Sequence, residues 1–313
     1  MLVVAKPAGP TSHDVVALVR RLTGTRRVGH GGTLDPFASG VLPVFLGRAT
    51  RLSEYHVGER KRYTATMCFG ESSTTDDLEG DRTRADGPAP DRTAVEAILP
   101  RFTGELEQVP PAYSAVHVAG RRAYALARAG VTPELAPRHV TIDELRLVEW
   151  DGSDPQRPIA VLDVRCSAGT YIRSLGRDLG AALGSAAYLG ALVRTQAGAF
   201  TLGDALQLDA LRGAANQGSE AIQRLLRPVD AGLERLPRAE VAADDVPKLA
   251  AGLAVRPVRP LDPATREAKV VRIAVDGGPI VAIGHVRSGR LAPDKVLVER
   301  AIPSTGEVAA APG

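Results

Sequence analysis

The sequence contains little cysteine, and its cysteines are not arranged for cross-linking or metal binding. Cys68 and Cys166 are the only cysteines in 313 residues, and each lies in a stretch with the pattern of a strand. No CxxC pair, paired histidines or acidic cluster occurs at ligand spacing, so neither a disulfide framework nor a zinc site is indicated. We interpret both thiols as buried structural side chains.

Long hydrophobic runs are also absent. The apolar run after Met1 ends before Lys6 and Pro7, which is too short for the hydrophobic region of a signal peptide. No later run approaches the length that crosses a bilayer. We therefore expect a cytoplasmic protein that has no membrane partner.

Lysine is scarce, and arginine supplies most of the 39 basic residues. The planar guanidinium suits phosphate and base contacts, but the coding bias of a GC-rich genome would give the same excess, and we attribute most of these arginines to that bias. The net charge of +3 and the isoelectric point near 9.0 permit nucleic-acid binding without selecting it.

Motifs for cofactor chemistry are missing as well. The chain has no P-loop, no HExxH and no GxSxG. Gly29 and Gly31 lack the companion helix and the distant acid of a dinucleotide site. We therefore expect a reaction that needs neither a metal nor a cofactor.

Hydrophobic periodicity predicts the elements of a chain long enough for two domains. Ser12 is the expected N-cap of an amphipathic helix that ends at Gly24. Residues 28–36 predict a loop, because they contain three glycines and a proline. Later patterns predict strands at 63–69, 140–150 and 159–166, a polar surface loop at 71–92, a short basic helix ending at Gly130 and a strand-turn-helix unit around Ser167.

The last third of the chain predicts a change of character. A helix is expected over roughly 205–226, and the segment from Pro228 to Pro237 is the predicted domain boundary. Beyond it, strands at 270–275 and 280–286 flank a DGGP hairpin turn. We expect a third strand at 295–299 and a disordered tail over 301–313.

The segment GHGGTLDP, residues 29–36, is the first candidate site. Because Asp35 precedes a proline, its backbone is biased towards extended geometry, and the nearby glycines let another chain approach. The segment could present one carboxylate to a large substrate, or Asp35 could simply close an Asx-turn. His30 could contact a phosphate or a base, although a lone histidine between glycines more often bonds within its loop.

Two further stretches combine an aromatic with a basic residue. In CSAGTYIRSL, residues 166–175, Arg173 could orient a carboxylate through a bidentate pair and Tyr171 could stack on a base. The alternative is a buried tyrosine beside a surface arginine. Tyr63 follows Lys61 and Arg62 at the start of a predicted strand, which is also the pattern of any strand end at a surface.

Six motifs together carry a family resemblance. They are KPAGPTSHD (6–14), VGHGGTLDPFASGVLP (28–43), KRYTATMCFGESSTTDDLEG (61–80), VPPAYSAVHVAGRRAYALARAG (109–130), CSAGTYIRSLGRDLG (166–180) and LVRTQAGAF (192–200). In this order and over essentially the full length, the sequence resembles the TruB-type tRNA pseudouridine-55 synthases.

The resemblance implies roles for the candidate residues. Asp35 becomes the essential aspartate, Arg173 its ion-pair partner, and Tyr63 an aromatic that packs on the target base and assists a late proton transfer. The first chemical step at Asp35 stays open, and we expect an ordinary carboxyl pKa of about 3.9, so that Asp35 is ionised at neutral pH. The implied substrate-binding and supporting residues are His30, Tyr171, Leu192, Lys6 and Asp77.

The fold implied by the resemblance is α+β, with a mainly antiparallel sheet and flanking helices. Residues 1–228 would form the catalytic domain, with an RNA-gripping insertion at about 109–138, and residues 237–300 a PUA-like RNA-binding domain. The implied substrate is uridine 55 in the T loop of tRNA, flipped out of the elbow and isomerised without a cofactor. We expect a monomer that uses no guide RNA.

The chain departs from the family pattern at Thr74, within SSTTDD, and at Val193, where many members have a first arginine before the one at Arg194. Asp77 and Arg194 keep the family residues, so we expect these departures to affect RNA affinity rather than chemistry. Two other functions compete with the isomerase. An RNA chaperone that folds tRNA elbows would need the RNA contacts but not Asp35. A glycoside hydrolase would need two carboxylates flanking the bond, and Asp77 would be the second.

Overall fold

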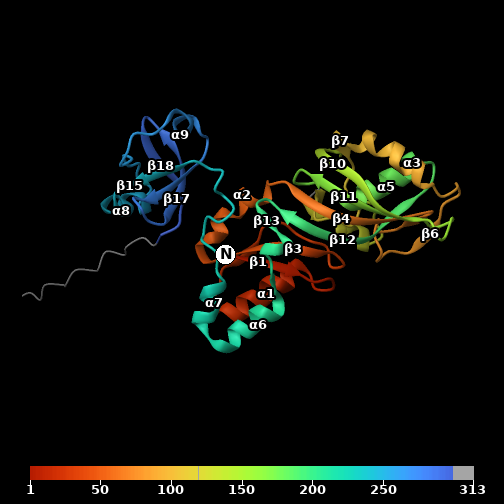
Figure 1. Cartoon of the computed structure of the whole chain (residues 1–313), viewed down its shortest axis with the longest axis horizontal. Coiled ribbons are helices and arrows are strands. Elements are labelled where there is room, and N and C mark those ends of the chain that lie inside the picture. Colours follow the sequence, from red (N-terminus) through yellow and green to blue (C-terminus); the bar gives the residue numbers. More distant parts are fainter. Residues whose placement is uncertain (119, 299–313) are drawn as a thin grey trace, which may run out of the picture. The chain divides into compact units, whose positions relative to one another are not determined.

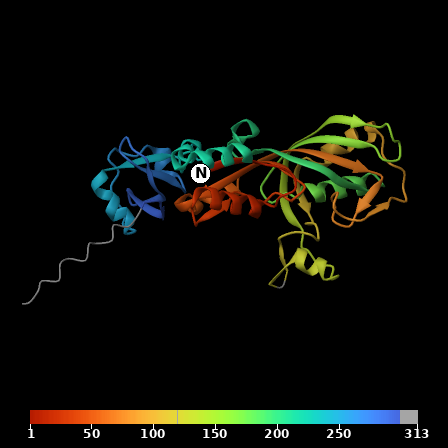
Figure 2. The same cartoon turned by 90° about the horizontal axis from the view of Figure 1, so that it is seen from below.

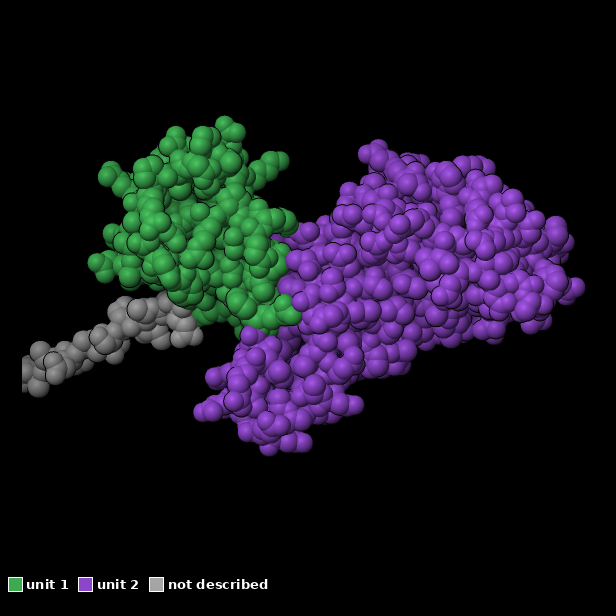
Figure 3. Space-filling view, viewed as in Figure 1, with its two compact units in different colours: residues 1, 45–53, 227–313 green, residues 2–44, 54–226 purple. Residues whose placement is uncertain are grey.

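The computed structural model describes residues 1–118 and 120–298 and divides into two compact units. One unit comprises Leu2–Val44 and Glu54–Leu226, and the other comprises Met1, Phe45–Ser53 and the chain from Arg227 onward (Figure 3). The first unit contains most of the sequence and all the candidate site residues.

The first unit is built on a large mixed sheet (Figure 1). Its strands follow the order β14 (Leu206–Gln207), β1 (Leu2–Lys6), β3 (Ser39–Leu46), β12 (Ala187–Ala197), β4 (Lys61–Phe69), β11 (Ile159–Cys166), β10 (Arg138–Asp151) and β7 (Gly104–Gln108). β2 (Val28–His30) pairs with β3, and β13 (Phe200–Thr201) pairs with β12. The pairs β1–β14 and β3–β12 are parallel, so the α+β class is confirmed with a mixed sheet.

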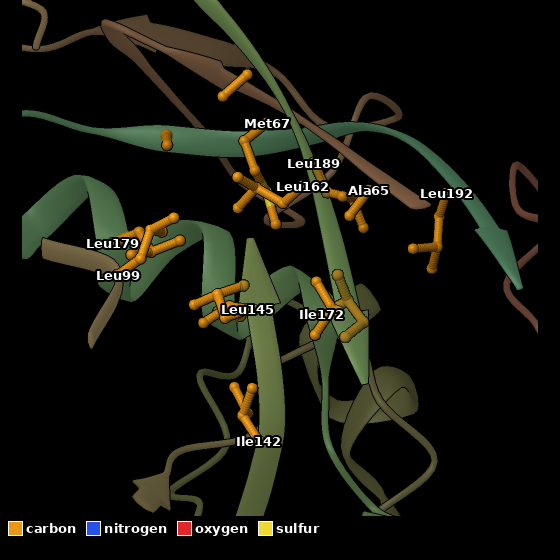
Figure 4. Close-up of a cluster of buried hydrophobic side chains, with 14 of the residues drawn as sticks. Ala65, Met67, Leu99, Ile142, Leu145, Leu162, Ile172, Leu179, Leu189 and Leu192 are labelled. Carbon is orange, nitrogen blue, oxygen red and sulfur yellow. The ribbon is translucent and has the colours of Figure 1, made fainter. Parts of the chain in front are cut away.

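Alternating apolar residues bury one face of the central strands. Ala65, Met67 and Phe69 of β4 are buried, whereas Thr64, Thr66 and Cys68 are half-buried. Helix α5 (Ile172–Ala182) covers this face, and its buried side chains meet those of β4, β11 and β12 (Figure 4). The predicted strands and the strand-turn-helix unit are therefore confirmed, because period-2 and period-3.6 patterns each bury one face.

The first helix shows how a cap can be misassigned. α1 (Ser12–Thr23) begins after Thr11, whose hydroxyl accepts from the Asp14 backbone while the Asp14 carboxylate accepts from the Thr11 backbone. The N-cap prediction for Ser12 is wrong, because this reciprocal capping box satisfies two free amides. The end at Gly24 is confirmed by its left-handed φ of 64°.

Two other predicted segments differ from the structure. The expected loop at 71–92 contains the hairpin β5 (Glu71–Ser73) and β6 (Arg82–Arg84), whose polar residues pair on either side of the connecting residues 74–81. The expected helix at 205–226 is two helices, α6 (Leu208–Gln217) and α7 (Ser219–Leu225), because Gly218 has a φ of 104° that no helix accommodates.

The first unit also contains several short elements. They are α2 (Ser53–Val57), α3 (Arg92–Ile98), the 3-10 helices η2 (Leu99–Phe102) and η3 (Leu202–Asp204), and, within 109–138, β8 (His117–Val118), β9 (Arg121–Arg122) and α4 (Ala123–Arg128). The 3-10 helix η1 (Gly47–Leu52) belongs to the other unit. Figure 2 shows the segment 109–138 extending away from the sheet. The basic helix predicted before Gly130 is confirmed as α4.

The second unit contains a small sheet in the order β15 (Arg238–Val241), β16 (Val271–Val275), β17 (Ile280–Arg287) and β18 (Arg290–Val296), with η4 (Ala243–Asp245), α8 (Val246–Ala250) and α9 (Pro263–Glu267). The predicted hairpin is confirmed as β16 and β17. The predicted third strand is present as β18, but it begins five positions before 295, after a tight turn at Ser288 and Gly289, and it ends at Val296. Residue 299 of that prediction lies outside the described residues. The predicted tail lies outside the described residues.

Candidate active site

Asp35 lies on a loop, residues 31–38, that joins β2 to β3, and we call it the Asp35 loop. Backbone contacts hold it from several sides: Gly31 donates to the carbonyl of Pro43 at 2.8 Å, and Gly9 donates to that of Pro36 at 2.8 Å. Within the loop, Ala38 donates to the carbonyl of Asp35 at 3.1 Å. The carboxylate is therefore presented by a rigid backbone.

Lys6 anchors the C-terminal half of the Asp35 loop. Its side chain is buried, and Nζ donates to the carbonyls of Pro7 at 2.9 Å, Pro36 at 3.1 Å and Ala38 at 2.6 Å. Burial lowers the pKa of this ammonium to about 8, although the nearby Asp35 carboxylate acts in the opposite direction. The predicted supporting position of Lys6 thus corresponds to contacts with loop backbone.

Ser12 and Arg194 anchor the N-terminal half. The Ser12 hydroxyl accepts from the Leu34 amide at 2.9 Å and lies 3.1 Å from the Leu34 carbonyl, to which it can donate. Arg194 of β12 donates to the carbonyls of Gly32 at 3.0 Å and Thr33 at 3.3 Å. The sequence predicted a capping role for Ser12 and showed Arg194 only as a retained family residue, so both contacts were missed.

Arg173 forms a bidentate ion pair with Asp35. Nε lies 3.1 Å from Oδ2 and Nη2 lies 3.2 Å from Oδ1. The remaining terminal nitrogen, Nη1, pairs with Oδ2 of Asp77 at 3.3 Å, so one guanidinium joins two carboxylates. Arg173 is the second residue of α5, and its side chain is 7% exposed against 33% for Asp35. The carboxylate is therefore reachable while its partner is fixed behind it.

The environment of Asp35 raises its pKa above the ordinary value. Burial is the largest cause, the Arg173 guanidinium opposes it, and the Asp77 charge adds to it. The expectation of an ordinary carboxyl pKa is therefore wrong, because the sequence could not show that Asp35 is withdrawn from water. The ion pair with Arg173 is what favours the charged form.

Asp77 is held by the turn between β5 and β6. Its Oδ1 accepts from the Thr75 hydroxyl at 2.5 Å and from the Glu79 amide at 3.0 Å. The carbonyl of Thr75 also accepts from Nη1 of Arg173, at 3.2 Å. Asp76 in the same turn has a left-handed φ of 61°, and its carboxylate pairs with Arg177 of α5 at 3.0 Å. Two arginines of one helix thus dock this turn against the site.

Tyr63 and Leu192 lie on neighbouring strands, β4 and β12. Leu192 is 7% exposed, is paired with Ala65, and appears at the edge of the core in Figure 4. Tyr63 is half-buried and pairs across the strands with Arg194. Burial raises the pKa of the Tyr63 hydroxyl, while Arg194 opposes that shift, so the phenol stays protonated at neutral pH.

His30 lies shortly before Asp35 in the sequence, and Tyr171 lies shortly before Arg173. The contacts that these two residues make are with other residues than the ion pair. Nδ1 of His30 accepts from the Gly32 amide at 3.3 Å, and its ring packs edge-on against His13. Burial lowers the pKa of His30, which keeps the imidazole neutral. Tyr171 is the N-cap of α5, and its backbone exchanges two hydrogen bonds with the Gln108 side chain. The roles of both residues stay predictions.

Residues 1–118 and 120–298 contain no group of three or more His, Cys, Asp or Glu side chains arranged to hold a metal ion. Over the same ranges, no helix combines the length and the apolar character that crossing a membrane requires. What the site offers chemically is one partly exposed carboxylate, a fixed guanidinium and a protonated phenol.

Comparison with known proteins identifies the family. Residues 20–172 match the model of the TruB family pseudouridylate synthase N-terminal domain, and residues 173–234 match the tRNA pseudouridylate synthase B C-terminal domain. The chain is 42% identical to tRNA pseudouridine synthase B of Bradyrhizobium diazoefficiens, over 95% of this chain and 85% of that one, and 45% identical to the same enzyme of Moorella thermoacetica, over 94% and 97%.

Solved structures show the same relationship. The chain resembles a protein of the archaeal box H/ACA sRNP Nop10-Cbf5 complex, with a TM-score of 0.71 and 28% identity over 96% of this chain and 86% of that one. A chain of a Cbf5-Nop10-Gar1 complex gives a TM-score of 0.71 and 26% identity. With matches of this identity and coverage, the chain belongs to the TruB family of pseudouridylate synthases.

Proposed function

We propose that this enzyme converts uridine 55 in the T loop of tRNA to pseudouridine, with Asp35 as the essential carboxylate. Its bacterial relatives are named tRNA pseudouridine synthase B, and they match it over nearly their whole length. The observation that carries the residue assignment is the ion pair, in which Arg173 contacts both oxygens of a carboxylate that is still one-third exposed.

The reaction needs a carboxylate and a pocket. The bond between N1 and C1′ breaks, the uracil turns, and C5 bonds to C1′ while the C5 proton leaves and N1 gains a proton. An ionised Asp35 can act as a nucleophile or as a base in this sequence, and no electrons enter or leave. Arg173 orients the carboxylate and favours its ionised form.

The target base must leave the folded T loop, which costs a few kcal/mol. Stacking on Tyr63 and packing against Leu192 would offset that cost. His30 and Tyr171 would line the pocket for the flipped nucleotides. We assign to the Tyr63 hydroxyl a late proton transfer, and Arg194 would assist it by opposing the rise in the pKa of this hydroxyl.

RNA binding is assigned to two other parts of the chain. In the segment 109–138, Arg121, Arg122 and Arg128 are exposed, and Arg128 lies over the ring of the exposed Tyr124 at 5.7 Å. This pattern of cations and an aromatic suits a stem-loop backbone. Residues 237–300 would form a PUA-like domain that contacts the acceptor stem. We propose a monomer that recognises tRNA directly, without a guide RNA.

The test uses an unmodified T stem-loop transcript, with no guide RNA and no added cofactor. The full chain should convert its uridine 55 equivalent, with no free uracil released. Asp35→Asn should bind the transcript and form no pseudouridine, whereas Asp209→Asn, a change at a 90% exposed carboxylate of α6, should behave as the parent. Activity retained in Asp35→Asn would contradict the assignment of Asp35, and free uracil would indicate a hydrolase.

A further inference from the structure

Arg194 is among the largest fully buried side chains of the described residues, with 1% exposure. Its Nε donates to the carbonyl of Val41 at 2.8 Å, and its two terminal nitrogens donate to those of Gly32 and Thr33. All of these acceptors are backbone carbonyls. Within residues 1–118 and 120–298, no carboxylate lies at ion-pair distance from this guanidinium.

A buried cation without an anionic partner is costly, because peptide dipoles replace water only in part. Lys6 shares this situation: its ammonium also contacts carbonyls alone, and the Arg194 charge contributes to lowering its pKa. The two cations hold opposite halves of the Asp35 loop. A hydrophobic side chain at 194 would avoid the cost, so the charge is better explained by what the guanidinium holds in place.

The backbones of β3 and β12 approach each other closely at Arg194. Gly40 pairs with Arg194 in parallel register, and a Cβ on Gly40 would lie 2.2 Å from the Arg194 carbonyl oxygen. Only a glycine lets the two backbones approach so closely. The short separation allows the side chain of Arg194 to reach the carbonyls of Gly32 and Thr33, which lie three and two residues before Asp35.

Arg194 also acts on Tyr63, its partner across the β12–β4 pair. The guanidinium charge opposes the rise in the pKa of Tyr63 that burial causes. Arg194 therefore contacts the backbone of the loop that carries Asp35, and it is paired across the strands with the aromatic proposed to pack on the base. At 1% exposure its side chain is enclosed by protein and is not available for contact with RNA.

We propose that Arg194 is a positioning residue, which holds the backbone of Gly32 and Thr33 so that the Asp35 carboxylate meets Arg173 in bidentate geometry, with Tyr63 fixed beside it. This role rests on the proposed function, because it concerns the alignment of the same site. A displacement of about 1 Å in such a site costs on the order of 100-fold in rate.

The experiment compares Arg194→Met and Arg194→Lys with the parent and with Arg165→Met. Arg165 is a matched control, since its side chain is 48% exposed on β11 and pairs with Glu144. Single-turnover rates on the T stem-loop are measured at saturating enzyme, and RNA affinity is measured separately. Circular dichroism at the assay temperature reports folding.

Arg194→Met should lower the single-turnover rate about 100-fold while the RNA Kd changes by less than about threefold. Arg194→Lys should recover part of the rate, because one ammonium can reach only some of the three carbonyls. In both variants the acid limb of the rate profile should move to higher pH, since a loosened contact with Arg173 raises the pKa of Asp35. Arg165→Met should match the parent.

A folded Arg194→Met protein with a parental rate and a parental acid limb would overturn the proposal, as would a loss explained by RNA affinity alone. If the methionine variant does not fold, the lysine variant decides by the same two readouts. An inactive parent would instead contradict the proposed function. In that case the positioning role is decided by a pH titration that follows the carbon-13 NMR signal of the Asp35 carboxyl. The pKa of this carboxyl must be higher in Arg194→Met and Arg194→Lys than in the parent.

Discussion

Arg173 contacts both carboxylate oxygens of Asp35, although 138 residues separate them in the sequence. The same guanidinium pairs with Asp77 and donates to the carbonyls of Thr75 and Tyr113. It therefore joins the Asp35 loop, the β5–β6 turn and the base of the segment 109–138. A side chain tied to three segments can fix an orientation that none of them fixes alone.

Arg173→Lys should test the bidentate contact. A single ammonium cannot replace a fork that contacts two carboxylates, so we expect the single-turnover rate to fall by about 100-fold or more. Arg173 lowers the pKa of Asp35 against the effect of burial, and the acid limb should therefore move to higher pH. A pH–rate profile checks this, and an unshifted limb would contradict the electrostatic role of Arg173.

Asp77→Asn should move the same limb in the opposite direction. The Asp77 charge raises the pKa of Asp35, so its removal should lower that pKa and extend activity to more acidic solution. Breaking a buried ion pair should also reduce the free energy of unfolding by about 3 kcal/mol. Chemical denaturation measures the second effect, and a limb that moves upward would show that loss of Arg173 alignment dominates.

Lys6 should give a basic limb near pH 8. Burial lowers its pKa to about 8 from an ordinary value of 10.5, and a neutral amine has fewer hydrogens than the three carbonyls it contacts. Activity should fall as pH rises through that value. The free energy of unfolding should instead increase as pH rises between these two pKa values. In that range the unfolded chain binds more protons at Lys6 than the folded protein does.

The corresponding variant is Lys6→Met. It should be less active at neutral pH and should lack the limb near pH 8, since no group at position 6 titrates. Rate profiles and thermal unfolding at several pH values separate the two effects. A basic limb that persists in Lys6→Met must arise from another group.

Tyr63→Phe should separate stacking from proton transfer. The ring remains, so RNA affinity should change little, whereas loss of the hydroxyl should slow the chemistry by about 100-fold if it transfers a proton. Tyr63→Leu should weaken both base packing and rate. Single-turnover kinetics with Tyr63→Phe decide whether the hydroxyl takes part in the chemistry. A rate equal to that of the parent would show that Tyr63 contributes to the reaction only through its ring.

Much of the fold followed from local patterns. The alternation from Tyr63 to Phe69 predicted β4, and helical spacing after Ser167 predicted α5, because both patterns reflect burial of one face. The errors came where a single backbone conformation overrode the pattern. Gly218 divides the helix expected at 205–226, and the Thr11–Asp14 capping box displaces the N-cap from Ser12.

The site could be predicted residue by residue only from the family resemblance. Read alone, the segment 29–36 was equally consistent with an Asx-turn. Nothing local indicated that Asp77 is buried, since the segment 71–92 is polar and acidic, and its burial depends on Arg173 from a distant helix. For Arg194 the sequence shows only that an arginine lies within an apolar strand. This pattern does not identify the backbone carbonyls to which the guanidinium donates.

By itself the sequence determined the family, the identity of the candidate residues and several elements, among them β4, β10, β11, α1 and α5, because these depend on periodicity and on motifs that are contiguous in the chain. Only the tertiary structure decided how Asp35 is held, the direction of its pKa shift, and the roles of Ser12 and Arg194. Those properties arise from contacts between segments far apart in sequence and from withdrawal of charges from water, which no local pattern encodes.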